Sequence, residues 1–209
     1  FLIIGSVPET YEEELHRLIN DFDLTSNIEF TGMMKYEEIF EFIEKAIVGL
    51  LCYLPEPNHL VTFPNKIFEY ISKGTPVIAS DFPLYRQVVN GSNCGRLVNP
   101  TNCDDIAGAI IFALNNPDKM KDYGINGYNA IIDRYNWKIE EVKLLKGTYH
   151  ILVNNTGGPA SGPIGAANTQ SFEDAFRMHL INNQILVQKV VEGMKKEGFG
   201  RIVNIISTS

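Results

Sequence analysis

Short apolar runs alternate along the chain with segments whose apolar residues recur at helical intervals. This alternation restricts the possible folds more than any other feature of the sequence. Continuous apolar runs closed by Gly or a polar residue are typical of strands buried on both faces. Strands that alternate with helices favour a mostly parallel sheet covered by helices on both sides. The sequence therefore predicts a doubly wound α/β fold, with strands at 1–5, 27–31, 46–54, 76–80 and 95–98 and helices at 8–22, 36–44, 64–73, 101–115, 117–134 and 137–146.

The pattern changes near residue 147. A further apolar strand is predicted at 149–153, and it leads into the turn Asn154-Asn155-Thr156-Gly157 and a loop rich in Gly, Pro, Ala and Ser. A long amphipathic helix is then expected at 172–197 and a last strand at 201–206. We therefore divide the chain into two parts, 1–147 and 148–209.

Composition restricts the partners. The 209 residues are 44% hydrophobic, enough to bury a core, and the net charge of −7 disfavours nucleic acid as a partner. No apolar run reaches the roughly 18 to 20 residues of a membrane span. Three cysteines without a C-x-x-C pair predict neither a disulfide framework nor a metal site, and they favour a cytoplasmic location. The chain begins inside an apolar run without the basic flank of a signal peptide, so we expect it to start within a domain.

The segment 62–81, TFPNKIFEYISKGTPVIASD, carries the most specific motif of the sequence. It resembles the donor-binding signature of GT-B glycosyltransferases of the retaining family 4. The resemblance implies that a helix N-terminus, with Asn65 and Lys66 in its first turn, faces the diphosphate of a nucleotide sugar of the UDP or GDP type. It also implies that Glu69 accepts hydrogen bonds from the ribose, and that Gly32 and Met33 lie against the base.

Each of these residues also has a simpler explanation. Lys66 and Glu69 are three positions apart and could form an exposed helical pair worth about 0.2–0.5 kcal/mol. Gly32 and Met33 could be a plain turn after a strand. The resemblance covers residues 1 to about 147, but it departs from the family at Val61, where a glutamate is usual. The family's first strand and helix and its acceptor domain have no counterpart in the sequence. The resemblance therefore implies a donor-binding module without catalytic activity on its own.

Residues 149–209 are similar to the middle of a short-chain dehydrogenase/reductase. Asn154 to Gly157 match that family's Asn-Asn-Ala-Gly signature beside the NAD(P) site, and Ser207 matches its catalytic serine. His179 stands where the family most often has an asparagine. The Gly-rich phosphate turn and the Tyr-x-x-x-Lys pair of that family have no counterpart in the sequence, so His179 and Ser207 are expected to be vestigial. Alternatively, Asn154 to Gly157 are an ordinary strand-to-turn ending.

The two incomplete Rossmann-like pieces meet near residue 148 without a flexible linker, as in a chimera. In the strand order 3-2-1-4-5-6 of the doubly wound fold, the absent first strand lies in the middle of the sheet. Its absence would leave two buried strand edges unpaired. We therefore expect one composite sheet, with 151–153 or 202–206 in the vacant place. Domain swapping in a homodimer is a second way to complete the sheet.

Three interpretations of function follow. The first is a nucleotide-sugar donor-binding module of a glycosyltransferase, inactive by itself, with a small-molecule nucleotide as its ligand. The second is a relic of an NAD(P)-dependent short-chain dehydrogenase/reductase, and the third is an engineered chimeric scaffold without function. None of the three requires a bound cofactor or metal for the fold.

Overall fold

The computed structural model describes residues 1–156, 165 and 168–205. It divides into two units, Phe1–Asn136 and Trp137–Ser209, which are described separately below. In the described part, the strands pair in parallel and alternate with helices, which confirms the predicted α/β class. The domain boundary at 147 stays a prediction.

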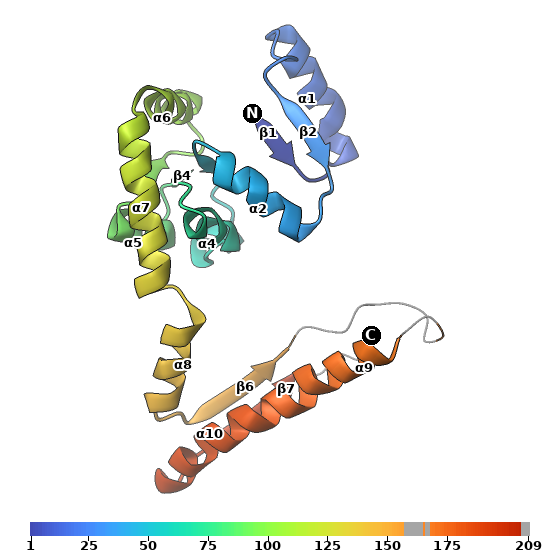
Figure 1. Ribbon diagram of the computed structural model, residues 1–209, viewed down its shortest axis with the longest axis vertical. Coiled ribbons are helices and arrows are strands. Elements are labelled where there is room, and N and C mark those ends of the chain that lie inside the picture. The colour runs from blue at the N-terminus through green and yellow to red at the C-terminus, as the bar shows by residue number, and fades with distance from the viewer. Residues whose placement is uncertain (157–164, 166–167, 206–209) are drawn as a thin grey trace. The chain divides into compact units, whose positions relative to one another are not determined.

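The first unit contains the five predicted strands and the predicted helices, together with two helices that the sequence analysis missed, α3 and α5 (Figure 1). In chain order its elements are β1 (Leu2–Ile4), α1 (Glu9–Asp21), β2 (Glu29–Gly32), α2 (Tyr36–Lys45), β3 (Gly49–Leu51), α3 (Pro57–Val61), α4 (Asn65–Ser72), β4 (Val77–Ser80), α5 (Pro83–Ser92), β5 (Gly95–Val98), α6 (Cys103–Asn115) and α7 (Pro117–Asp133).

The strands of the first unit form two sheets. β1 pairs with β2, and β3, β4 and β5 form a second sheet in that order. The order 3-2-1-4-5-6 accounts for this split, because β1 to β5 take the places of strands 2 to 6. The strand that would join β1 to β3 has no counterpart among the described residues.

The core of the first unit lies on both faces of β4, whose four residues are all buried. Val77 and Ala79 point to one face and pack with α4 and α5 residues, including Ile71 and Tyr85. Ile78 belongs to a separate cluster with residues of β5, α6 and α7. Burying one such aliphatic side chain stabilises the fold by about 1.5–3 kcal/mol. The two clusters therefore fix α4 on one face of this sheet and α6 on the other.

Two glycines allow α7 to approach the turn after α4 closely. Gly74 ends α4 with a φ of +73°, a conformation that favours glycine. A Cβ atom added to Gly124 of α7 would lie 2.1 Å from the carbonyl oxygen of Gly74. The helix and the turn are thus in backbone contact at this point.

The second unit contains α8 (Trp137–Lys146), β6 (Ile151–Asn155), a long helical stretch and β7 (Arg201–Ile205). The stretch is continuous from Thr169 to Lys196 and has three parts: α9 (Thr169–Phe176), the π-helical turn η2 (Arg177–Ile181) and α10 (Asn182–Lys196). It confirms the long predicted helix, although the π turn was not predicted. α10 buries Val190 and Met194.

Within the second unit, β6 pairs with β7 in a two-stranded sheet, and the expected composite sheet stays a prediction. The two strands are parallel and in register over five residue pairs, from Ile151 with Arg201 to Asn155 with Ile205. The helical crossover brings β7 directly beside β6, so the backbone groups on the facing edges of the two strands are paired within their own unit. The described strands therefore form three sheets.

Candidate functional site

The site begins at α4, the helix predicted to face a diphosphate. Ile67 and Ile71 are fully buried and fix the helix on its sheet, while Asn65 and Lys66 in the first turn are exposed. Pro64 precedes the helix, and its carbonyl accepts the Ile67 N–H at 3.1 Å. Among the described residues, no side chain caps this end. The first amides of a helix have no partner within it, so an anion at this end would be favoured.

Glu69 lies one turn further along α4 and is half-buried. Its Oε1 accepts a hydrogen bond of 3.1 Å from the hydroxyl of Tyr36, the first residue of α2. Tyr36 comes three positions after Met33, which is 79% exposed, and Gly32 has a φ of +67°. The structure thus joins Glu69 to the residue that ends the Gly32-Met33 loop, although these predicted site residues lie far apart in the sequence.

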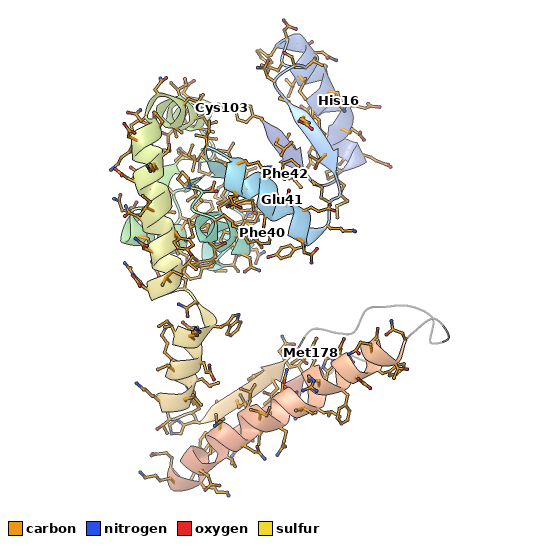
Figure 2. All side chains as sticks on the ribbon, viewed as in Figure 1. His16, Phe40, Glu41, Phe42, Cys103 and Met178 are labelled. Carbon is orange, nitrogen blue, oxygen red and sulfur yellow. The ribbon has the colours of Figure 1, made fainter. Side chains whose placement is uncertain are left out.

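A hollow of about 340 Å³ surrounds this hydrogen bond. Half of its lining residues are aromatic, and an amide, a carboxylate and a hydroxyl lie among the rings: Tyr36, Phe40, Asn65, Phe68, Glu69, Ser72, Ile131 and Tyr135. Phe40 projects from α2 on the side of α4 (Figure 2). The volume is within the range of small-molecule sites, and flat rings beside hydrogen-bonding groups suit a ligand that has a ring and hydroxyl groups.

The aromatic lining was missed by the sequence analysis. Tyr36 and Phe40 are four residues apart on α2, so their shared face was a signal that could have been used. The contact of Tyr36 with Glu69, 33 residues away, had no local signal. The pKa of Tyr36 is raised above its ordinary value, chiefly because its hydroxyl donates to the Glu69 carboxylate.

Two residues that the sequence analysis singled out, Val61 and Lys66, do not line this hollow. Val61, where the resembled family usually has a glutamate, is the last residue of α3 and is 71% exposed. Lys66 is exposed, and no ion pair between it and Glu69 is present among the described residues. The simple helical-pair explanation therefore has no support in the geometry.

In the second unit, the predicted cofactor residue Asn154 is buried and its amide donates to Asn204 Oδ1 across the strands at 2.8 Å. His179 lies in the π turn, with its Nδ1 2.6 Å from the hydroxyl oxygen of Thr156. His179 Nε2 and Asn154 Oδ1 are buried and have no hydrogen-bond partner in the described part of the chain. Gly157 and Ser207 lie outside the described residues.

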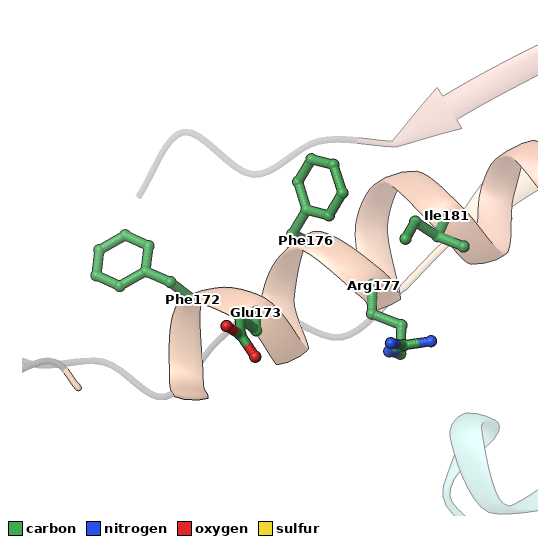
Figure 3. A pocket seen from close by; sticks show the side chains of 5 residues that line it. All are labelled: Phe172, Glu173, Phe176, Arg177 and Ile181. Atoms are coloured by element: carbon green, nitrogen blue, oxygen red, sulfur yellow. The ribbon is translucent and has the colours of Figure 1, made fainter. Parts of the chain in front are cut away.

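A second hollow, of about 430 Å³, is also in this unit (Figure 3). Its lining comes from one helical stretch, with Phe172, Phe176 and Ile181 beside Glu173 and Arg177. A single stretch of helix supplies no converging groups, so this hollow is not a candidate site. In the described residues no group of three potential metal ligands occurs, and no helix has the length and apolar character of a membrane span.

Comparison with known proteins finds two families, one for each part of the chain. The family described as glycosyl transferases group 1 matches residues 1–130, and the family described as short chain dehydrogenase matches residues 129–209. An uncharacterized glycosyltransferase of Methanocaldococcus jannaschii is 25% identical over 142 residues, 68% of this chain and 35% of that protein. The MMP alpha-(1->4)-mannosyltransferase of Mycolicibacterium hassiacum is 23% identical over 123 residues, 58% of this chain and 29% of that protein.

Solved structures agree in fold. The sucrose-phosphate synthase of Thermosynechococcus elongatus is 25% identical with a TM-score of 0.59, covering 68% of this chain and 36% of that one. Anabaena HepE in complex with UDP is 19% identical with a TM-score of 0.58, covering 68% of this chain and 38% of that one. The chain thus spans about a third of the length of the curated relatives and solved structures that it matches. Because residues 1–130 are more than half of the 209 residues, the chain belongs to the glycosyl transferases group 1 family.

Proposed function

We propose that the chain binds the nucleoside diphosphate part of a nucleotide sugar and is a donor-binding module without catalytic activity on its own. The observation that carries the proposal is the arrangement of Glu69, held by Tyr36, one turn from the uncapped start of α4. Asn65 and Lys66 in that first turn supply amides and a positive charge for the diphosphate. Glu69 supplies an acceptor for the ribose hydroxyls, and Gly32 and Met33 lie against the base.

A uridine or guanosine diphosphate is the proposed ligand class. The structure of Anabaena HepE that the fold resembles is a complex with UDP, and a second one is a complex with UDP-glucose, which supports UDP as the first ligand to test. The proposed lack of catalysis rests on Val61, because the resembled family's pattern usually has a carboxylate there.

The experiment is a thermal-shift titration with UDP, GDP, ADP, NAD and NADP. A ligand that binds only the folded state stabilises it by RT ln(1 + [L]/Kd), about 2.7 kcal/mol at one hundred times Kd. UDP or GDP is expected to stabilise the chain, and the variant Lys66→Ala/Glu69→Ala is expected to lose this effect. The matched control is Glu192→Ala/Lys195→Ala, which removes an exposed ion pair of the same spacing in α10.

Binding that survives Lys66→Ala/Glu69→Ala would place the nucleotide elsewhere and contradict the proposed site. A cooperative melt that no nucleotide shifts would contradict nucleotide binding altogether and leave the engineered scaffold as the interpretation. Release of UDP from UDP-glucose by the purified chain would contradict the proposed inactivity.

A second candidate function is NAD(P) binding by a dehydrogenase relic, and two observations favour it. The short chain dehydrogenase family matches residues 129–209, and the buried His179 Nε2 and Asn154 Oδ1 have no hydrogen-bond partner in the described residues. A shift with NAD or NADP that Asn154→Ala removes would support this candidate. Two family matches that meet at residues 129–130 also support the proposal that the chain joins pieces of two families.

Two further proposals concern the cellular location of the chain and its oligomeric state. The three cysteines are free, which supports a reducing, cytoplasmic location. A homodimer formed by domain swapping would complete the divided sheets, and the mass measured by light scattering at increasing concentration tests it.

A further inference from the structure

The hydrogen bond between Tyr36 and Glu69 is more than the fold needs to hold α2 against α4. The last turn of α2 is already connected to the residues that follow α4: the buried hydroxyl of Thr75 donates to the Ile43 carbonyl at 2.6 Å, and Lys73 pairs with Glu44 at 3.7 Å. Tyr36, by contrast, is 57% exposed. Ordering a glutamate side chain costs conformational entropy, so a bond at an exposed position that fixes one adds little to stability.

The ring of Tyr36 is held by a contact that does not involve Glu69. The rings of Tyr36 and Phe40 meet edge to face, with their centroids 5.0 Å apart and their planes at 89°. This contact aims the hydroxyl at Glu69 Oε1, 3.1 Å away. An ionised carboxylate has two oxygens with about four acceptor positions, so one donor on Oε1 leaves Oε2 for other donors.

We propose that Tyr36 is a positioning residue, which holds the Glu69 carboxylate in the orientation that accepts hydrogen bonds from the ribose hydroxyls of the bound nucleotide. This inference rests on the proposed function. A carboxylate that is already ordered loses less entropy when the ligand binds, so the bond strengthens binding through preorganisation. The gain applies only to ligands whose ribose hydroxyls reach Glu69, so Tyr36 sets the preference for ribonucleotides.

The raised pKa of Tyr36 agrees with this arrangement, because the bond to Glu69 is its largest cause. The phenol therefore stays protonated, and able to donate, throughout the neutral range. The Tyr36 to Glu69 contact also gives a readout without any ligand: in Glu69→Gln, the pKa of Tyr36 measured by NMR should fall towards its ordinary value.

The test is calorimetric titration of the full chain with UDP and with 2′,3′-dideoxyuridine diphosphate, which lacks the ribose hydroxyls. Tyr36→Phe is expected to weaken UDP binding about three- to tenfold, as for the loss of one hydrogen bond, and to leave the dideoxy compound unchanged. In Glu69→Leu, which has no acceptor at this position, the preference for UDP is expected to disappear, and adding Tyr36→Phe should change nothing more. Tyr128→Phe, at a half-exposed tyrosine of α7, is the matched control.

Each outcome decides between the two proposals. If Glu69→Leu removes the preference for UDP but Tyr36→Phe binds UDP as well as or better than the wild type, the positioning role is overturned and the site stands. Equal weakening of both nucleotides in Tyr36→Phe also overturns it, because a loss of packing would act on both. If the wild type does not distinguish the two nucleotides, or binds neither, the proposed role of Glu69 fails and the role of Tyr36 fails with it.

Discussion

Replacing Gly124 by alanine tests how closely α7 packs on the turn after α4. In an open helix interior, alanine is more stable than glycine by about 1 kcal/mol. At Gly124 the new methyl group would lie 2.1 Å from the Gly74 carbonyl oxygen, which belongs to backbone with a φ of +73° and cannot rotate away as a side chain would. Overpacking of this kind costs about 1–3 kcal/mol, and a backbone obstacle places it at the upper end. We expect a net loss of about 1–2 kcal/mol.

The matched control is Gly108→Ala in α6, where an added Cβ meets no atom within 4 Å. This variant keeps only the gain in helix propensity and should be stabilised by about 0.5–1 kcal/mol. Urea denaturation followed by far-UV circular dichroism measures both changes as shifts of the midpoint at a constant slope. Equal stabilisation of the two variants would refute the close approach of α7 to Gly74.

Three further predictions concern single groups. Asn102→Ala should lower stability by about 1 kcal/mol in urea denaturation, because the Asn102 side chain accepts two amide hydrogen bonds at the start of α6. Burial raises the pKa of the Cys94 thiol to about 11, so a thiol reagent at pH 8 should label exposed Cys103 quickly and Cys94 only after unfolding. The hydrogen bond from Arg86 lowers the pKa of Asp81 below its ordinary value of 3.8. The pair therefore stabilises the fold above about pH 4 and loses this effect as the pH falls through the folded pKa, and Arg86→Gln should flatten acid unfolding in that range.

Local patterns in the sequence predicted the elements well. The five strands of the first unit and the long helix of the second were found because apolar runs and helical spacing are properties of neighbouring residues. The missed helix α5 carried the same signals, with Pro83 at its first position and apolar residues at Leu84, Tyr85, Val88 and Val89. The helix expected at 101–115 begins at Cys103, because Asn102 caps it by accepting two amide hydrogen bonds.

Pairings between distant residues could not be predicted in this way. The choice of β7 as the partner of β6, rather than an open edge of another sheet, depends on where the crossover returns the chain. The hydrogen bond from Tyr36 to Glu69 likewise depends on the packing of two helices. The motif at 62–81 placed Asn65, Lys66 and Glu69 on one helix, but other rings of the hollow come from α2 and from Tyr135, which follows α7.

Because the strands form three small sheets, their backbone hydrogen bonds differ in how easily they break locally. Among the described strands, β4 alone is paired on both sides, and its four residues are buried. Every other strand has one partner and a free edge, so its amides exchange with solvent after smaller local openings. Hydrogen exchange should therefore be slowest at Val77–Ser80 and faster in β1 and β2 and in β6 and β7. Within the folded state, local opening is therefore expected to be rarest around β4 and more frequent in the strands that have a single partner.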